Sequence, residues 1–290
     1  MGSAALRGVS ALRSSGPPDM LLGLQSRAEN VALVRQALTG LGAALQLDGA
    51  VLADVKTAVS EACNNVVVHA YGGRAGPMEV YVRPNGHELV VVVRDDGEGI
   101  HPRPVEPDAP MQGVGLSLIQ ALTKSVEFGG GLSEGTEVRM VFEAPGDVDP
   151  GGVETIDGTE PIPSPPPPGD VTLSVCGLLV GPVLSSVVAM VAARSGFSVE
   201  RLSDAQILSD TIAAHAPAAF PSRHVQVGID AENGELLMRV GPLVTDGAEA
   251  LVRASGVAGL EPLLERLPDE LGVERPGGAE ELLVRLRDPG

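Results

Sequence analysis

The chain has 290 residues and a formal net charge of -18 at pH 7, so it is long enough for two ordinary domains and strongly acidic. An acidic surface repels nucleic-acid phosphates and anionic lipid headgroups, so neither direct nucleic-acid binding nor a membrane role is expected. Hydrophobic residues make up 43% of the chain, which excludes a disordered protein, whereas aromatic residues make up only 2%. The cores must therefore be built from Val, Leu, Ile and Ala.

The clearest domain boundary is the stretch of residues 144–170, which is rich in Pro, Gly and acidic residues and has no Lys or Arg. Such a composition cannot bury enough apolar surface to fold, and its proline run should be extended. We therefore predict a flexible leader over 1–19, a first domain over 20–143, this linker, and a second domain over 171–290.

The sequence of the first domain predicts strands and helices that alternate along the chain. Apolar residues recur at helical spacing, and two β-rich runs flank the Asn85-Gly86 pair, which is a strong hairpin signal. In chain order we predict a strand over 21–26, helices over 28–45 and 48–71, a hairpin over 78–95, a helix over 113–128 that runs toward another strand, and a closing strand over 135–144. This order predicts an α+β fold, a two-layer sandwich of helices on one face of a mostly antiparallel sheet.

The second domain repeats that order without its glycines. In chain order we predict a strand over 171–180, helices over 181–197 and 200–216, an Asn-Gly hairpin over 225–240, and a helix and strand over 261–286. We therefore predict that the fold is duplicated and that the second half is a degenerate second copy. Cys63 and Cys176 each lie inside an apolar segment and are expected to be reduced core thiols. No run of about 20 apolar residues is apparent, so no membrane-spanning helix is expected.

The stretch VSEACNNVVVHAY, residues 59–71, puts polar side chains into an apolar helical pattern. Glu61 and Asn65 are four residues apart and so lie on one face of the helix. Taken alone, such a pair is typical of a solvated face. The motifs that follow this helix favour a functional role for the pair instead.

Three glycine-containing motifs come after this helix. RDDGEGI carries Asp95 in a D-x-G-x-G arrangement after a strand, where an ionised Asp can accept a hydrogen bond from an exocyclic amine. GVGLSLI begins a helix whose free N–H groups suit an anion, and EGTEVRM precedes the last strand. Each motif alone is typical of an ordinary turn or helix cap. All four together, in this order and on these elements, indicate a nucleotide site.

Through these motifs, residues 20–143 resemble the GHKL superfamily of ATP-binding domains. More narrowly, DVKTAVSEACNNVVVHAYGG and VVVRDDGEGI resemble the bacterial anti-sigma-factor serine/threonine kinases. The resemblance covers under half of the chain. It implies a Bergerat-type ATP-binding fold, ATP and Mg²⁺ as cofactors, and phosphoryl transfer to a serine or threonine of a partner, a reaction governed by positioning and charge stabilisation.

The resemblance also implies roles for four polar residues. Asn65 matches the asparagine that holds Mg²⁺ bridging the ATP phosphates. Glu61 matches the carboxylate that orients or deprotonates the attacking hydroxyl. Asp95 matches the aspartate that reads the adenine amine, and Thr136 should support the adenine through Asp95 or a water.

The glycines receive their roles in the same way. Gly97 and Gly99 are implied to shape the adenine pocket. Gly113 and Gly115 match the hinge and phosphate-contacting glycines, and Leu116 beside them belongs to the same nucleotide-binding set. The loop between the two glycine motifs, residues 101–112, matches the lid that folds over the phosphates in this family. Here the lid is short and proline-rich, and its one arginine is Arg103, with His101 nearby. ATP binding is therefore a stronger expectation than kinase activity.

Other polar residues are expected to be structural. His69 and Tyr71 belong to the helix motif but are interpreted as packing or polar support, and Asn64 lies outside the family pattern. In the second domain His215 falls near the equivalent of Asn65, but no D-x-G-x-G or G-x-G-L motif accompanies it. We therefore predict that the second domain binds no ATP.

Three functions remain open. The first is an ATP-dependent serine/threonine protein kinase of the anti-sigma-factor type, which binds a sigma factor or similar client and phosphorylates an anti-sigma antagonist. The second is a non-catalytic regulator in which ATP gates partner binding, and the third is a histidine kinase fragment. The related kinases are usually homodimers, so the second copy predicts a pseudo-dimer within one chain, with a homodimer as the alternative. The implied ATP site and the lack of an export signal predict a cytoplasmic protein.

Overall fold

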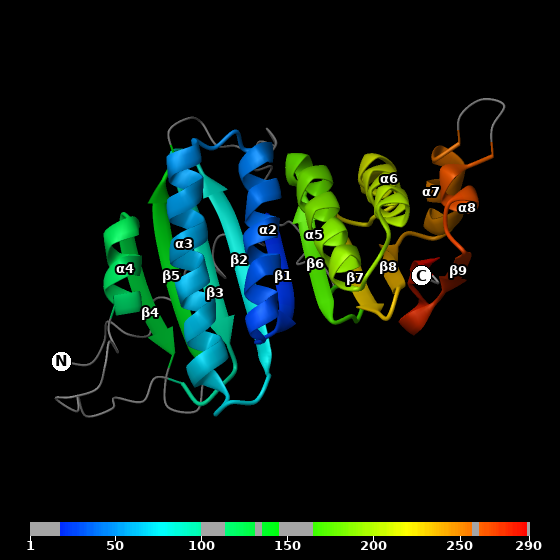
Figure 1. Cartoon of the computed structure of the whole chain (residues 1–290). Helices are drawn as coiled ribbons and strands as arrows, with labels where there is room; N and C mark the ends of the chain where they lie inside the picture. Colours follow the sequence, from blue (N-terminus) through cyan, green and yellow to red (C-terminus); the bar gives the residue numbers. More distant parts are fainter. Residues whose placement is uncertain (1–17, 100–113, 131–134, 145–164, 257–260, 289–290) are drawn as a thin grey trace. The chain divides into compact units, whose positions relative to one another are not determined.

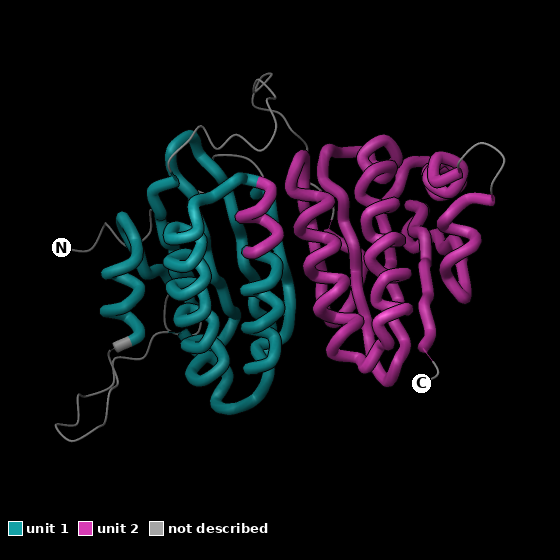
Figure 2. Tube along the Cα trace, turned by 45° about the horizontal axis from the view of Figure 1, so that its top comes forward, with its two compact units in different colours: residues 1–38, 45–160 teal, residues 39–44, 161–290 magenta. Residues whose placement is uncertain are grey.

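The structure is a computed structural model that describes residues 18–99, 114–130, 135–144, 165–256 and 261–288. The chain divides into two compact units, residues 1–38 with 45–160 and residues 39–44 with 161–290 (Figure 2). Most of the predicted leader, most of the predicted linker and the whole lid over 101–112 lie outside the described residues. The predicted domain limits stay a prediction.

Unit 1 is a layer of helices on an antiparallel sheet, which confirms the α+β fold (Figure 1). Its strands pair in the order β4-β5-β3-β2-β1, and α3 contacts both β3 and β5. In chain order the elements are β1 (Met20–Gln25), most of α2 (Ala28–Ala44), α3 (Gly49–Asn65), the π-helical turn η1 (Val66–Ala70), β2 (Pro77–Asn85), β3 (Glu88–Asp95), α4 (Val114–Leu122), β4 (Ser125–Gly130) and β5 (Thr136–Glu143).

The core of unit 1 follows from the alternation of its strands. Met78, Val80 and Val82 of β2 are fully buried and alternate with less buried residues, as expected for a sheet with one face against helices. Strand β3 is apolar on both faces, because Val90 and Val92 form a second small cluster with Val141 and Tyr81. The sheet that carries the predicted site residues is therefore packed on both sides near β3.

Two predicted helices of unit 1 end earlier than expected. The helix predicted over 48–71 is α-helical only to Asn65 and continues as the π turn η1. The helix predicted over 113–128 ends at Leu122, and residues 125–130 form strand β4. Helical periodicity in apolar side chains does not separate a helix from the strand that follows it when both face the same core.

Unit 2 is also a layer of helices on an antiparallel sheet, with strand order β6-β7-β8-β10-β9. In chain order its elements are β6 (Val171–Cys176), η2 (Gly177–Leu179), α5 (Val180–Arg194), α6 (Val199–His215), η3 (Ala216–Ala218), β7 (His224–Glu232), β8 (Glu235–Leu243), α7 (Gly247–Ala254), α8 (Leu263–Arg266), β9 (Glu270–Glu274), η4 (Pro276–Gly278) and β10 (Glu280–Arg287). Taken in sequence, the strands of unit 2 pair in the same order as those of unit 1. Duplication as the origin of this likeness stays a prediction.

Four features of unit 2 differ from the sequence analysis. The predicted strand over 171–180 ends at Cys176, and helix α7 was not predicted at all. The region predicted as one helix and one strand over 261–286 holds the short helix α8 and two strands, β9 and β10. The stretch Gly177–Arg194 is long and apolar enough to cross a membrane, contrary to the expectation that no such run exists. One such helix is weak evidence for a membrane span, because a core helix has the same composition. Here Val183, Leu184, Val187 and Val188 of this stretch are fully buried in unit 2.

Both cysteines are free and buried, as predicted. Burial raises the pKa of the Cys63 thiol to about 12, so this side chain stays a protonated core residue at neutral pH.

Candidate functional site

The polar face of α3 forms the first part of the candidate site. Glu61 and Asn65 are half-buried one helical turn apart, whereas Ala58, Ala62 and Cys63 of the same helix are buried in the core. The first turn of α4 lies directly against the polar face, because a Cβ atom added to Gly115 would come 3.2 Å from Glu61 Oε2 and 3.9 Å from Asn65 Oδ1. Glycine at this position leaves the carboxylate and the carboxamide uncovered.

The end of strand β3 forms the second part. Asp95 is its last residue, is only 3% exposed, and accepts a hydrogen bond of 2.8 Å from the Gly97 amide. In the sheet register Asp95 lies opposite Thr136, the first residue of β5. Burial raises the pKa of Asp95, and hydrogen bonds from Gly97 and Thr136 act in the opposite direction. The arrangement presents a buried carboxylate, held from two sides, that can accept a hydrogen bond from an amino group.

The loop after Asp95 rests on the end of η1, the π turn that continues α3. The Glu98 amide donates to the Ala70 carbonyl at 2.9 Å. A Cβ atom on Gly97 would lie 2.2 Å from the same carbonyl oxygen, so only glycine fits there. Gly99 has a φ of +79° and closes the turn. The two parts of the site are thus joined through residues 66–71, which link the polar face of α3 to the Asp95 loop.

Most of the predicted site residues therefore gather at one end of unit 1. Leu116, in the first turn of α4, is 46% exposed. Gly113, His101 and Arg103 lie outside the described residues. Gly76, Ala70 and Tyr71 also contact this region, but the sequence analysis assigned them no role in binding. Ala70 and Tyr71 meet residues 96–98 of the loop, which lie more than 20 residues further along the chain, so no spacing pattern could have revealed these contacts.

The donor set suits a magnesium ion that is held mainly by phosphates. Asn65 offers one carboxamide oxygen and Glu61 one carboxylate on an open helix face. In the described part of the chain no group of three or more His, Cys, Asp or Glu residues is placed to hold a metal. Magnesium commonly keeps several waters and uses one or two protein oxygens with substrate phosphates, so these residues fit ATP–Mg²⁺.

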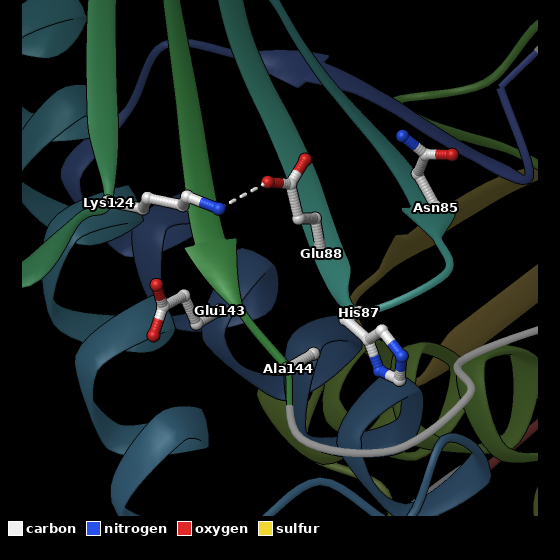
Figure 3. Close-up of a pocket in the computed structure, with 6 residues that line it drawn as sticks. All are labelled: Asn85, His87, Glu88, Lys124, Glu143 and Ala144. Carbon is white, nitrogen blue, oxygen red and sulfur yellow. Dashed lines mark hydrogen bonds and ion pairs between the residues drawn. The ribbon is translucent and has the colours of Figure 1, made fainter.

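A separate pocket lies at the opposite end of β3 (Figure 3). It is lined by Asn85, His87, Glu88, Lys124, Glu143 and Ala144. The Lys124 ammonium donates to the Glu88 carboxylate at 2.7 Å and lowers the pKa of that carboxyl. Glu88 and Asp95 are the first and last residues of β3, so they are about 23 Å apart along the strand. This pocket is not part of the candidate site.

Similarity to known proteins agrees with this geometry. The histidine kinase-like ATPase domain family matches residues 24–142. The anti-sigma F factor of Clostridium botulinum (strain Eklund 17B / Type B) is 31% identical over 132 residues, which cover 42% of this chain and 91% of that protein. The anti-sigma F factor of Thermoanaerobacter sp. (strain X514) is 28% identical over 129 residues, which cover 42% of this chain and 90% of that protein.

Among solved structures, the blue-light activated histidine kinase of Erythrobacter litoralis EL346 is 25% identical with a TM-score of 0.27. That match covers 33% of this chain and 31% of the kinase, so this chain spans less than a third of that protein. The family match and the similarity to nearly whole anti-sigma F factors do not depend on it. The chain therefore belongs to the GHKL family of histidine kinase-like ATPase domains.

Proposed function

We propose that the protein is an ATP-dependent serine/threonine kinase that acts as an anti-sigma-factor-type switch. The observation that supports this most is the meeting of Gly115 with Glu61 and Asn65, together with the buried Asp95, whose loop is hydrogen-bonded to Ala70 and Tyr71 after the same helix. A kinase of this type needs a metal ligand, a carboxylate near the transferred group and an adenine acceptor. Similarity to proteins named anti-sigma F factor over about nine-tenths of their length favours the same class.

Each residue would contribute one step. Asp95 accepts a hydrogen bond from the adenine amino group, with Thr136 holding the carboxylate in place. Asn65 provides an oxygen to Mg²⁺, which supplies charge stabilisation to the phosphates when bound. Glu61 orients the attacking hydroxyl of the partner or accepts its proton. Gly97, with Gly99 after it, lets the backbone approach the base closely. Catalysis would therefore come from positioning and electrostatics rather than from covalent chemistry on the protein.

A nucleotide-gated regulator without transfer activity is the second candidate. The predicted lid over 101–112 contains a single arginine, Arg103, and several prolines. Phosphoryl transfer gains most from positive charge placed at the phosphates, so a lid this poor in basic residues favours binding over catalysis.

The proposed partners follow from the same family. We propose a sigma factor or similar client as the bound partner, an anti-sigma antagonist as the phosphorylated substrate, and a cytoplasmic location. The second unit would act as a built-in pseudo-partner in place of a second chain. Light scattering tests this arrangement: a monomer in solution supports it, and a tight homodimer contradicts it.

Nucleotide binding and transfer with labelled ATP and Mg²⁺ test the proposed function directly. We would compare wild type with Asn65→Ala and Glu61→Ala over a panel of candidate antagonist proteins. Asn64→Ala is the matched control, because Asn64 is the adjacent asparagine on the same helix and is exposed. Transfer reduced more than about 100-fold in both site variants but not in the control supports the kinase.

Two other outcomes separate the candidates. ATP binding without transfer to any antagonist supports the nucleotide-gated regulator instead. No ATP binding by the wild-type protein overturns both.

A further inference from the structure

The Tyr71 hydroxyl bridges two segments that are distant in sequence. It donates a hydrogen bond to the Pro77 carbonyl at 2.5 Å and accepts one from the Asp96 amide at 2.9 Å. Pro77 is the first residue of β2, and Asp96 directly follows the proposed adenine acceptor Asp95. A single side chain therefore ties the start of one strand to the backbone of the adenine loop.

The Tyr71 ring occupies a slot that the backbone keeps open for it. A Cβ atom on Gly76 would lie 2.4 Å from the ring, so any larger residue at that position would displace the tyrosine. The Gly76 amide donates to Ser26 Oγ at 3.0 Å and the Gly76 carbonyl accepts from the Ser26 amide at 2.8 Å. These two hydrogen bonds fix the backbone of Gly76, and the position of Gly76 in turn fixes the position of the Tyr71 ring.

Tyr71 acts together with the residue before it. The Ala70 carbonyl accepts the Glu98 amide, while the Tyr71 hydroxyl accepts the Asp96 amide. Two consecutive residues at the end of the helix thus hold two alternate amides of the loop. The intervening turn η1 is a π-helix that begins directly after Asn65, and π turns inside helices occur often at functional sites.

We propose that Tyr71 is a positioning residue for nucleotide binding, which holds the Asp95 loop in fixed register with the helix that carries Asn65. The proposal rests on the proposed ATP site at Asp95 and Asn65. Asp95 would read the adenine at one end of the nucleotide, and Asn65 would hold the metal at the other. The Tyr71–Asp96 hydrogen bond would keep these two ends at the separation that ATP requires.

The protonation state of Tyr71 suits this role. Burial raises the pKa of the hydroxyl, and the carboxylates of Asp95, Asp96 and Glu79 raise it further, against the opposing effect of the Asp96 amide. The hydroxyl therefore stays protonated at neutral pH and can donate and accept at the same time.

The chain offers a matched control for this proposal, because it contains two tyrosines and no tryptophan. The second tyrosine, Tyr81, packs against Val90, Val92 and Val141, and its hydroxyl donates to Glu79. Tyr71→Phe and Tyr81→Phe each remove one hydroxyl and keep the ring. We would measure the Kd for ATP with Mg²⁺ by calorimetry and the melting temperature of the full chain for both variants and wild type.

Tyr71→Phe should raise the Kd for ATP about three- to tenfold, as expected for one lost neutral hydrogen bond, while Tyr81→Phe leaves it unchanged. Hydrogen exchange at residues 95–99 should be faster in Tyr71→Phe than in Tyr81→Phe. A role limited to general stability would instead lower the melting temperature without a selective loss of ATP affinity. Equal ATP affinity in Tyr71→Phe and wild type overturns the positioning role and leaves the proposed function intact.

A second measurement keeps the proposal testable if Tyr71→Phe does not fold. Gly76→Ala places a Cβ atom 2.4 Å from the Tyr71 ring and so displaces it while the hydroxyl is kept, and it should raise the Kd for ATP as well. A folded Gly76→Ala protein with the wild-type Kd for ATP overturns the proposal. Wild-type protein that binds no ATP overturns the proposed function itself, and the positioning role with it.

Discussion

The two units have the same succession of paired strands but end their third strands differently. In unit 1, β3 ends at Asp95 opposite Thr136, and the two side chains hold each other. In unit 2, β8 ends at Leu243 opposite Glu280. Glu280 accepts the Ala248 amide at 3.3 Å and pairs with Arg275 at 2.7 Å. The place of Asp95, the proposed adenine acceptor of unit 1, is thus taken in unit 2 by the apolar residue Leu243, which lies opposite the helix-capping carboxylate of Glu280.

The chain that follows these strands differs in length. Residues 96–113 separate β3 from α4, whereas only residues 244–246 separate β8 from α7. Helix α7 therefore begins immediately beyond the strand end and packs on β10, with Glu280 at its first turn. A carboxylate stabilises the positive end of a helix, so in unit 2 this position serves the fold.

The long helices differ in the same way. Helices α3 and α6 both have 17 residues, and the positions of Glu61 and Asn65 correspond to Thr211 and His215. Thr211 donates its hydroxyl to the Ile207 carbonyl at 2.7 Å and is buried. That unit 2 binds no ATP stays a prediction. The comparison indicates that one framework can hold either a polar site or a packed helix at the same strand ends.

The largest expected effect comes from exchanging the two carboxylates for amides. Asp95→Asn removes the proposed adenine acceptor and should weaken ATP binding about 10- to 100-fold, because a hydrogen bond to a charged group contributes about 1.5–3 kcal/mol. Glu280→Gln, the corresponding change in unit 2, should leave the Kd for ATP unchanged. Calorimetry on both variants measures the difference. Equal loss in the two would mean that the units are not functionally distinct.

A smaller effect is expected from crowding the Asp95 loop. Gly97→Ala would place a Cβ atom 2.2 Å from the Ala70 carbonyl oxygen, so the loop must shift. We expect a loss of about 1–3 kcal/mol in the free energy of unfolding together with weaker ATP binding. Gly49→Ala is the control, since nothing lies within 4 Å of its Cβ position. Denaturant titration that gives equal midpoints for the two variants would contradict the close contact.

The pH dependence of stability should have opposite signs at the two carboxylates. Burial raises the pKa of Asp95, so the folded state favours the protonated carboxyl. The stability that this carboxyl contributes is present below the unfolded-state pKa and is lost as pH rises through the higher folded-state pKa. The pKa of Glu280 is lowered, chiefly by Arg275, so its contribution is present above the unfolded-state pKa and is lost as pH falls through the lower folded-state pKa.

Unfolding titrations from neutral pH into the acid range on Asp95→Asn and Glu280→Gln measure this difference. On acidification, the free energy of unfolding of wild type should rise relative to that of Asp95→Asn. It should fall relative to that of Glu280→Gln. The same sign in both variants would show that burial does not dominate at Asp95.

The smallest effects are expected at the first turns of the two long helices. Asp48 accepts the Ala50 amide at 2.8 Å at the start of α3, and Ser198 accepts the Arg201 amide at 3.3 Å at the start of α6. Asp48→Ala should cost about 1 kcal/mol in unfolding free energy and Ser198→Ala about 0.5 kcal/mol, given the longer bond. Hydrogen exchange in α3 and α6 separates the two effects. A larger loss at Ser198 would contradict this ranking.

Local sequence predicted most of the framework correctly in unit 1. Period-two apolar residues around Asn85-Gly86 identified β2 and β3, and helical spacing identified α2 and α3, because these signals depend on neighbours along the chain. The same local signals did not predict η1, β4, α7 or β9. Whether a helix widens, stops or is inserted depends on packing partners that the local pattern does not contain.

The sequence by itself determined the family and the order of the candidate site residues, since Glu61, Asn65, Asp95 and Thr136 lie in motifs whose spacing is fixed along the chain. Only the tertiary structure decided which of them meet. The approach of Gly115 to Glu61, the Tyr71 bridge to Asp96 and the turn of Glu280 toward α7 all join residues that are distant in sequence. Such contacts arise from how helices and strands pack, which no local spacing specifies.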